Sequence, residues 1–139
     1  MFDINSLLPY YPMPVADNAA YHKHILKEYV ELVALEHLSQ SAYAPRLVFI
    51  GGTCLRLVHG IDRFSEDLDF DCKDLPQEDF MKMTDMLVEH LRANGLLVET
   101  RDRANDRLTA YRRNLYFPGL LFEMGLTGHR EVKIEAQDD

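Results

Sequence analysis

The sequence lacks any apolar run near the roughly 20 residues that a membrane-spanning helix needs. Its start, MFDINSLLPYYPMP, has no basic region before a long apolar segment, so we expect neither a membrane span nor a signal peptide. There are only two cysteines, Cys54 and Cys72, and their spacing matches no zinc or redox motif. We therefore expect two reduced thiols in a cytoplasmic protein. Internal repeats, low-complexity segments and linkers are also absent from the sequence.

Positive charge is scarce as well. The net charge is −8, with 15 Lys and Arg against 23 Asp and Glu. This balance argues against a surface coated for non-specific nucleic-acid binding, but not against a local basic patch. Such a patch is formed by Arg101, Arg103, Arg107, Arg112 and Arg113. It would either contact RNA phosphates or be the solvated face of a β-hairpin, which the interleaved Asp102 and Asp106 favour.

What the sequence does contain is enough apolar material for one domain. It has 139 residues and is 47% hydrophobic, within the range of a single globular unit. Helical spacing predicts helices over 19–39 and 78–93, with a short helix over 53–59. Strand-like runs are RLVFI (46–50), EDLDFD (66–71), 96–103, 107–118, a short piece near 120–124 and EVKIEA (131–136). Turn signals at Asn105-Asp106, Pro118-Gly119 and Thr127-Gly128 suggest a β meander, giving an α+β fold in two layers.

The run RFSEDLDFD (63–71) carries the first chemical signal. On a strand, Asp67 and Asp69 project from one face with Cα atoms about 6.5–7 Å apart, while Leu68 and Phe70 face the core. Two carboxylates so close repel each other unless a cation sits between them. Mg²⁺ binds through one or two carboxylates plus substrate phosphates. The strand is therefore a candidate metal platform, with a merely solvated edge strand as the alternative.

Two further segments add to this signal. FIGGT (49–53) leads a strand through two glycines into a helix start, where free N–H groups suit phosphates; the alternative is an ordinary strand-to-helix turn. In EVKIEA (131–136), one face carries Val132, Ile134 and Ala136, and the other carries Glu131, Lys133 and Glu135. A third carboxylate beside the first two would complete a site for two Mg²⁺ and an in-line displacement. Alternation alone does not choose between Glu131 and Glu135.

Taken together, these residues resemble the DNA polymerase beta superfamily of nucleotidyltransferases, in particular the AbiEii/AbiGii toxin branch. The pattern of that branch has two glycines, spaced leucines, R-x-S-x-D-hydrophobic-D-F and a later KIE. This sequence matches it at Gly51, Gly52, Thr53, Leu55, Leu57, Arg63, Ser65, Asp67, Leu68, Asp69 and Phe70. The match is strong over 46–71 and moderate over 131–136. It implies a nucleotidyltransferase-like mixed sheet with helices packed on one face. It also implies a catalytic-core domain over 1–139 that lacks the helical C-terminal half of the family.

The resemblance also implies roles. Asp67, Asp69 and Glu135 would be catalytic and would hold Mg²⁺. Gly51, Gly52 and Thr53 would hold the triphosphate, and Arg63 and Ser65 would brace the loop or touch phosphate. An acceptor hydroxyl, in some members on tRNA, would attack the α-phosphate of a nucleoside triphosphate. Such proteins are toxins of bacterial toxin–antitoxin pairs in abortive infection, so an antitoxin would be a partner.

Two other functions remain open from the sequence. A non-catalytic module of the same fold would bind a nucleotide or a partner protein without turnover. A glycosyltransferase would use D-x-D to hold a nucleotide-sugar, but this leaves GGT and KIE unexplained.

Overall fold

The computed structural model describes residues 3–60, 64, 67–102 and 110–129. The N-terminal arm forms two 3-10 turns (Ile4–Ser6 and Leu8–Tyr10) and the short helix α1 (Met13–Ala16). There follow the helices and strands α2 (Ala19–Ser39), a 3-10 turn (Ala44–Arg46), β1 (Leu47–Ile50), α3 (Gly51–Leu57), β2 (Asp67–Cys72), α4 (Gln77–Ala93), β3 (Glu99–Asp102), β4 (Ala110–Phe117) and β5 (Phe122–His129). None of these helices is long and apolar enough to cross a membrane.

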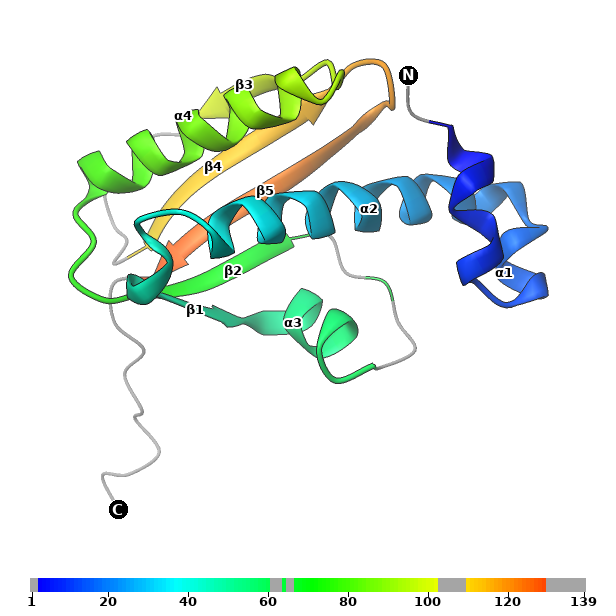
Figure 1. Ribbon diagram of the computed structural model, residues 1–139, viewed down its shortest axis with the longest axis horizontal. Coiled ribbons are helices and arrows are strands. Elements are labelled where there is room, and N and C mark those ends of the chain that lie inside the picture. Colours follow the sequence, from blue (N-terminus) through cyan, green and yellow to red (C-terminus); the bar gives the residue numbers. More distant parts are fainter. Residues whose placement is uncertain (1–2, 61–63, 65–66, 103–109, 130–139) are drawn as a thin grey trace.

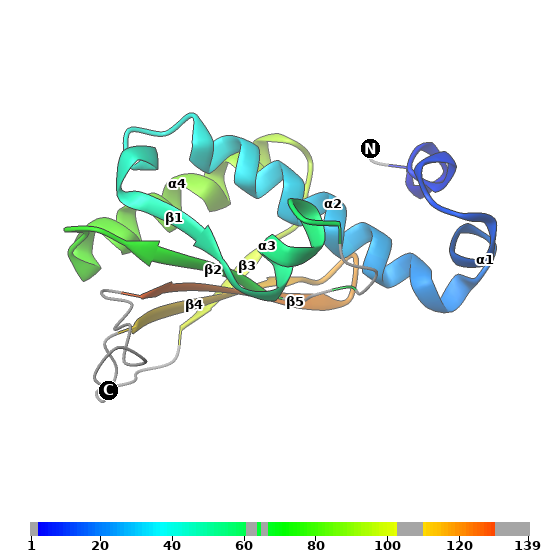
Figure 2. The same cartoon turned by 90° about the horizontal axis from the view of Figure 1, so that it is seen from below.

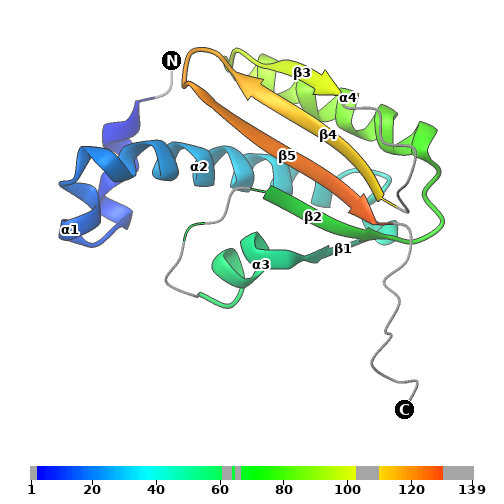
Figure 3. The same cartoon turned by 180° about the vertical axis from the view of Figure 1, so that it is seen from behind.

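The strands form one five-stranded mixed sheet in the order β1-β2-β5-β4-β3, seen from its open side in Figure 3. Strands β3, β4 and β5 pair antiparallel in sequence, which confirms the predicted meander. The last strand of the meander then pairs parallel with β2, and β2 pairs antiparallel with β1. The acidic strand therefore lies inside the sheet, between β1 and β5.

Helices α2 and α4 pack side by side on one face of this sheet (Figures 1 and 2). Helix α2 begins after Asn18, whose side chain accepts a hydrogen bond from the Ala20 N–H at 3.0 Å and so caps the helix. The apolar face of α4 is buried at Phe80, Met83, Leu87 and Leu91. Among the described residues, no helix covers the other face (Figure 2). The α+β fold with helices on one face of a mixed sheet is therefore confirmed.

Two local predictions need correction. Helix α3 begins at Gly51, two residues earlier than expected, so the glycines form its first turn. The predicted turn at Thr127-Gly128 lies inside β5. Glycine is needed at position 128 because β5 packs closely against the core here: a Cβ would lie 2.9 Å from both Cys72 Sγ and Phe80 Cε1. The predicted strand over 131–136 lies outside the described residues.

We expect the substitution Gly128→Ala to destabilise the fold by about 1–3 kcal/mol, because the added methyl overpacks the contact between β5 and Phe80. Gly119→Ala is the matched control, since its Cβ would meet only Leu97 Cδ1 at an ordinary 3.7 Å. Urea unfolding of both variants measures the difference. Equal stabilities would show that this packing constraint is absent.

Candidate active site

Strand β2 separates its two faces as the sequence predicted. Leu68 and Phe70 are buried against the helices, whereas Asp67, Asp69 and Asp71 are half-buried on the opposite face. Burial, and then the negative charge of Asp67, raise the pKa of Asp69 above its ordinary value, and the positive charges of His129 and Arg112 oppose this rise. The two carboxylates therefore repel each other, and a cation bound between them would relieve this repulsion.

The neighbouring strands supply the surroundings of these acids. Gly125 and Thr127 on β5 pair with Asp67 and Asp69, and Arg112 on β4 pairs with Thr127. A Cβ on Gly125 would lie 2.7 Å from Asp67 Oδ1 and 2.8 Å from Arg112 Nη2. This glycine thus makes the space in which Asp67 and Arg112 meet. Thr127 is 6% exposed, and its hydroxyl has no hydrogen-bond partner among the described residues.

Two basic side chains lie beside the acids. Arg112 Nη2 is 3.7 Å from Asp67 Oδ1, and His129 Nε2 is 4.0 Å from Asp69 Oδ1. Both contacts are long and partly exposed, so they are weak pairs that a ligand can replace. Arg112 Nε also donates to Asn114 Oδ1 at 3.3 Å, which orients the guanidinium. Sequence reasoning gave neither Arg112 nor His129 a role at the acids, because only the strand register brings them there.

The glycine bend lies against the second acid. Gly51 has φ +85°, and a Cβ on it would lie 2.7 Å from Asp69 Oδ2. Gly51 and Gly52 are exposed at the start of α3, directly after β1. The structure therefore brings the predicted phosphate-binding bend and the predicted metal platform together.

Thr53 points the other way. It is 1% exposed, and its hydroxyl donates to the backbone carbonyl of Asp67 and lies 3.2 Å from Glu31 Oε2. The hydroxyl is thus bonded within the protein, and does not face the open side of the bend. Glu31, also 1% exposed, was missed by sequence reasoning. Its only signal was a second acid one turn after Glu28 on the predicted helix, and both of these acids are buried.

The remaining predicted site residues, Arg63, Ser65 and Glu135, lie outside the described residues, as does Glu131. Phe64, between the first two, is described. Its ring contacts Arg56 of α3, with the guanidinium carbon 4.7 Å from the ring centre, and stacks on His24 of α2 with the ring centres 5.2 Å apart. Within the described ranges, no three His, Cys, Asp or Glu residues are grouped to hold a metal. The third carboxylate therefore stays a prediction.

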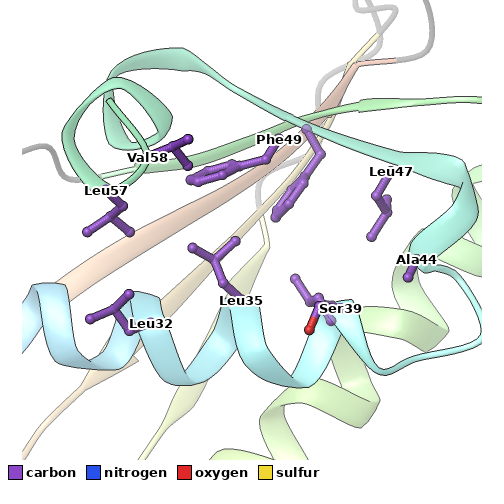
Figure 4. A pocket seen from close by; sticks show the side chains of 10 residues that line it. Leu32, Leu35, Ser39, Ala44, Leu47, Phe49, Leu57 and Val58 are labelled. Atoms are coloured by element: carbon purple, nitrogen blue, oxygen red, sulfur yellow. The ribbon is translucent and has the colours of Figure 1, made fainter. Parts of the chain in front are cut away.

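An apolar pocket of about 430 Å³ lies on the other side of the sheet (Figure 4). Its walls come from α2, from β1 and from the end of α3, and include Leu35, Phe49 and Leu57. Phe70 also lines it, and this residue alternates with Asp69 and Asp71 along β2. The pocket is therefore separate from the acidic face.

The buried Glu31 predicts a pH-dependent stability. Burial raises its pKa from 4.5 to about 8, so the folded protein keeps a proton that the unfolded chain has already lost. Stability must then fall as pH rises from about 4.5 to 8, by at most about 1.4 kcal/mol per pH unit. We expect this fall to be smaller in the variant Glu31→Gln, measured by urea unfolding in metal-free buffer. Glu36→Gln, exposed on the same helix, should follow the wild type. Parallel curves for the wild type and Glu31→Gln would contradict the assignment.

Comparison with known proteins agrees with this geometry. A crystal structure from H. pylori, described as a candidate nucleotidyltransferase, matches 82% of the chain at 22% identity with a TM-score of 0.53. The H. pylori protein JHP933 matches 82% at 20% identity with a TM-score of 0.54. These similarities show the fold, and the chain spans only 48% and 47% of the two proteins. Comparison with curated proteins gave no match. The profile "Nucleotidyl transferase AbiEii toxin, Type IV TA system" matches residues 33–136, most of the chain, which therefore belongs to the AbiEii nucleotidyl transferase toxin family.

Proposed function

We propose that this protein is a Mg²⁺-dependent nucleotidyltransferase that moves a nucleoside monophosphate from a nucleoside triphosphate to an acceptor hydroxyl. The observation that supports this most directly is the contact between the Gly51 bend and the Asp69 carboxylate on the open face of the sheet. Family membership gives the reaction class.

The acidic pair suits Mg²⁺ in its chemistry. Both side chains offer hard carboxylate oxygens, and their repulsion favours a cation at this position. Asp67 and Asp69 would hold the ion, with Glu135 as the third carboxylate that the family resemblance implies. When bound, Mg²⁺ would neutralise charge on the phosphates and on the leaving group.

The triphosphate would lie between the bend and the acids. Gly51 and Gly52 carry no side chains there, so the nucleotide can approach their backbone closely. Arg63 and Ser65 would act from the loop before β2. In this proposal Thr53 supports the site without contacting the nucleotide, because its hydroxyl is already bonded to Asp67 and Glu31.

The reaction itself is a displacement at phosphorus. The acceptor hydroxyl oxygen forms a new bond to the α-phosphorus as the bond to the bridging oxygen of the pyrophosphate breaks. Pyrophosphate leaves with the electron pair of that bond. A site carboxylate accepts the hydroxyl proton.

Arg112 is a further residue for this reaction. It is exposed, lies beside Asp67 and is held by Asn114. A guanidinium at this position can exchange its weak carboxylate contact for a bidentate contact with phosphate. Thr127, with its unbonded hydroxyl opposite Asp69, would donate a hydrogen bond to the same ligand.

An RNA acceptor, with tRNA as the first candidate, is part of the proposal. Of the arginines considered from the sequence, Arg113 is excluded from this role because it is buried against α4, where it contacts Thr84 and Asp85. Arg101 remains at the surface, 4.0 Å above the ring of Tyr116. Together with Arg112 it places two cations on the open face, and its contact with Glu123, 3.5 Å away and partly exposed, is one that a phosphate can replace.

We expect Asp69→Asn to reduce transfer of label from an α-³²P nucleoside triphosphate to background in the full-length protein, because a metal-binding carboxylate is lost. Asp67→Asn should do the same. Asp71→Asn is the matched control: it removes an acid from the same face of the same strand, further from the bend, and should retain activity. Full activity of Asp69→Asn would refute the mechanism.

Two consequences follow from the toxin family. Expression of the wild type should arrest bacterial growth, and co-expression of the product of the neighbouring gene, the candidate antitoxin, should relieve it. Asp69→Asn should not arrest growth. An arrest that persists in this variant would separate toxicity from nucleotide transfer.

A binding module without turnover is the second candidate, because the chain spans about half of the solved structures it matches. Titration calorimetry with Mg²⁺ and each triphosphate, beside the transfer assay, separates the two. Binding without product would favour the module, and product would exclude it.

A further inference from the structure

A buried polar chain connects the helix layer to the acidic strand. Glu31 on α2 lies 3.2 Å from the Thr53 hydroxyl on α3, and that hydroxyl contacts the backbone carbonyl of Asp67 on β2. Glu31 and Thr53 are each 1% exposed. Three elements far apart in the sequence thus meet directly behind the first predicted metal ligand.

The number of protons available in this hydrogen-bond chain indicates the protonation state of Glu31. A threonine hydroxyl has one proton to donate, but here it lies between two oxygens, the Glu31 carboxyl and the Asp67 carbonyl. With an ionised Glu31, one of these contacts would have no proton in it. With a protonated Glu31, the acid donates to Thr53 and Thr53 donates to the carbonyl, so each contact is a hydrogen bond.

The charged neighbours leave this assignment intact. On α2 these are Lys27 and Glu28, on α3 Arg56, and on β2 Asp67. Arg56 contacts Glu28 through Nε at 2.8 Å, and Lys27 lies over the Phe122 ring at 5.6 Å. Burial is the strongest influence that favours the proton on Glu31, and the charges of Glu28 and Asp67 add to it, whereas a hydrogen bond from Thr53 and the charge of Lys27 oppose it.

The carbonyl of Asp67 needs this partner for a structural reason. Pairing of β1 with β2 ends at Ile50 and Asp69, because the chain turns into α3 at Gly51. Asp67, the first residue of β2, therefore lies beyond the end of β1. The Thr53 hydroxyl takes the place of the missing strand partner and fixes the backbone from which the Asp67 carboxylate projects.

We propose that Glu31, in its protonated form, is a positioning residue for nucleotide transfer, acting through Thr53 on the backbone of Asp67. This inference rests on the proposed function. Docking of α3 on α2 has a second polar contact, because Glu28, one turn before Glu31, binds Arg56. We therefore expect Glu31 to affect the orientation of the Asp67 carboxylate more than the assembly of the fold.

The test compares four variants in the full-length protein. Glu31→Ala and Thr53→Val should lower kcat by about 10–100-fold, the range for residues that orient metal ligands, with KM for the nucleotide changed less than kcat. Glu31→Gln and Thr53→Ser should stay close to wild type, because a glutamine amide and a serine hydroxyl keep the same donors.

A matched control distinguishes positioning from general stability. Thr84 is also 1% exposed, and its hydroxyl is bonded to α4 carbonyls and to Arg113 Nη1 on the helix side of the sheet, away from the acids. Thr84→Val should retain kcat even where its unfolding free energy falls as much as that of Thr53→Val. Equal losses of kcat in both variants, or a loss in Glu31→Gln as large as in Glu31→Ala, would overturn the proposal.

A readout besides activity separates this inference from the proposed function. The infrared difference spectrum between wild type and Glu31→Gln at neutral pH should show the C=O stretch of one protonated carboxylic acid. Its absence would overturn the protonated state. An inactive wild type that shows this band would refute nucleotide transfer and the positioning role, and leave the hydrogen-bond chain standing.

Discussion

The rest of the structure depends on one electrostatic constraint: Asp67 and Asp69 lie on the same face of one strand and repel each other. The neighbouring residues keep the two acids in that arrangement and leave the space around them open. Gly51 and Gly125 leave out the Cβ atoms that would collide with the two carboxylates. Arg112 and His129 offset part of the charge through long contacts. The result is a pair of acids that is kept in place and still accessible to a cation.

The same strand also anchors the fold. Leu68 and Phe70 are buried among the helices, so the site cannot shift relative to the core without breaking close packing. The helix layer reaches the acids by a polar route as well, since α2 presents Glu28 and Glu31 to Arg56 and Thr53 of α3. Stability and chemistry therefore share β2, with packing on one face and ligand binding on the other.

Periodic patterns predicted well where one residue type repeats on one face. The limits of α2 and α4, the burial of Leu68 and Phe70, and the meander of β3 to β5 all follow from local sequence. The prediction of a turn at Thr127-Gly128 was wrong because Gly128 serves packing against Phe80, a contact between residues distant in the chain. Arg112, His129 and Thr127 gained their place beside the acids only through the β4 and β5 register.

By itself, the sequence determined the alternation of acids with core residues, the two glycines before them and the family that this combination indicates. These are local properties, because strand geometry places every second side chain on one face whatever surrounds it. Only the tertiary structure decided that Thr53 faces inward, that Glu31 stands behind Asp67, and that Gly51 lies against Asp69. Such contacts join α2, α3 and β2, and no spacing along the chain specifies which of their side chains meet.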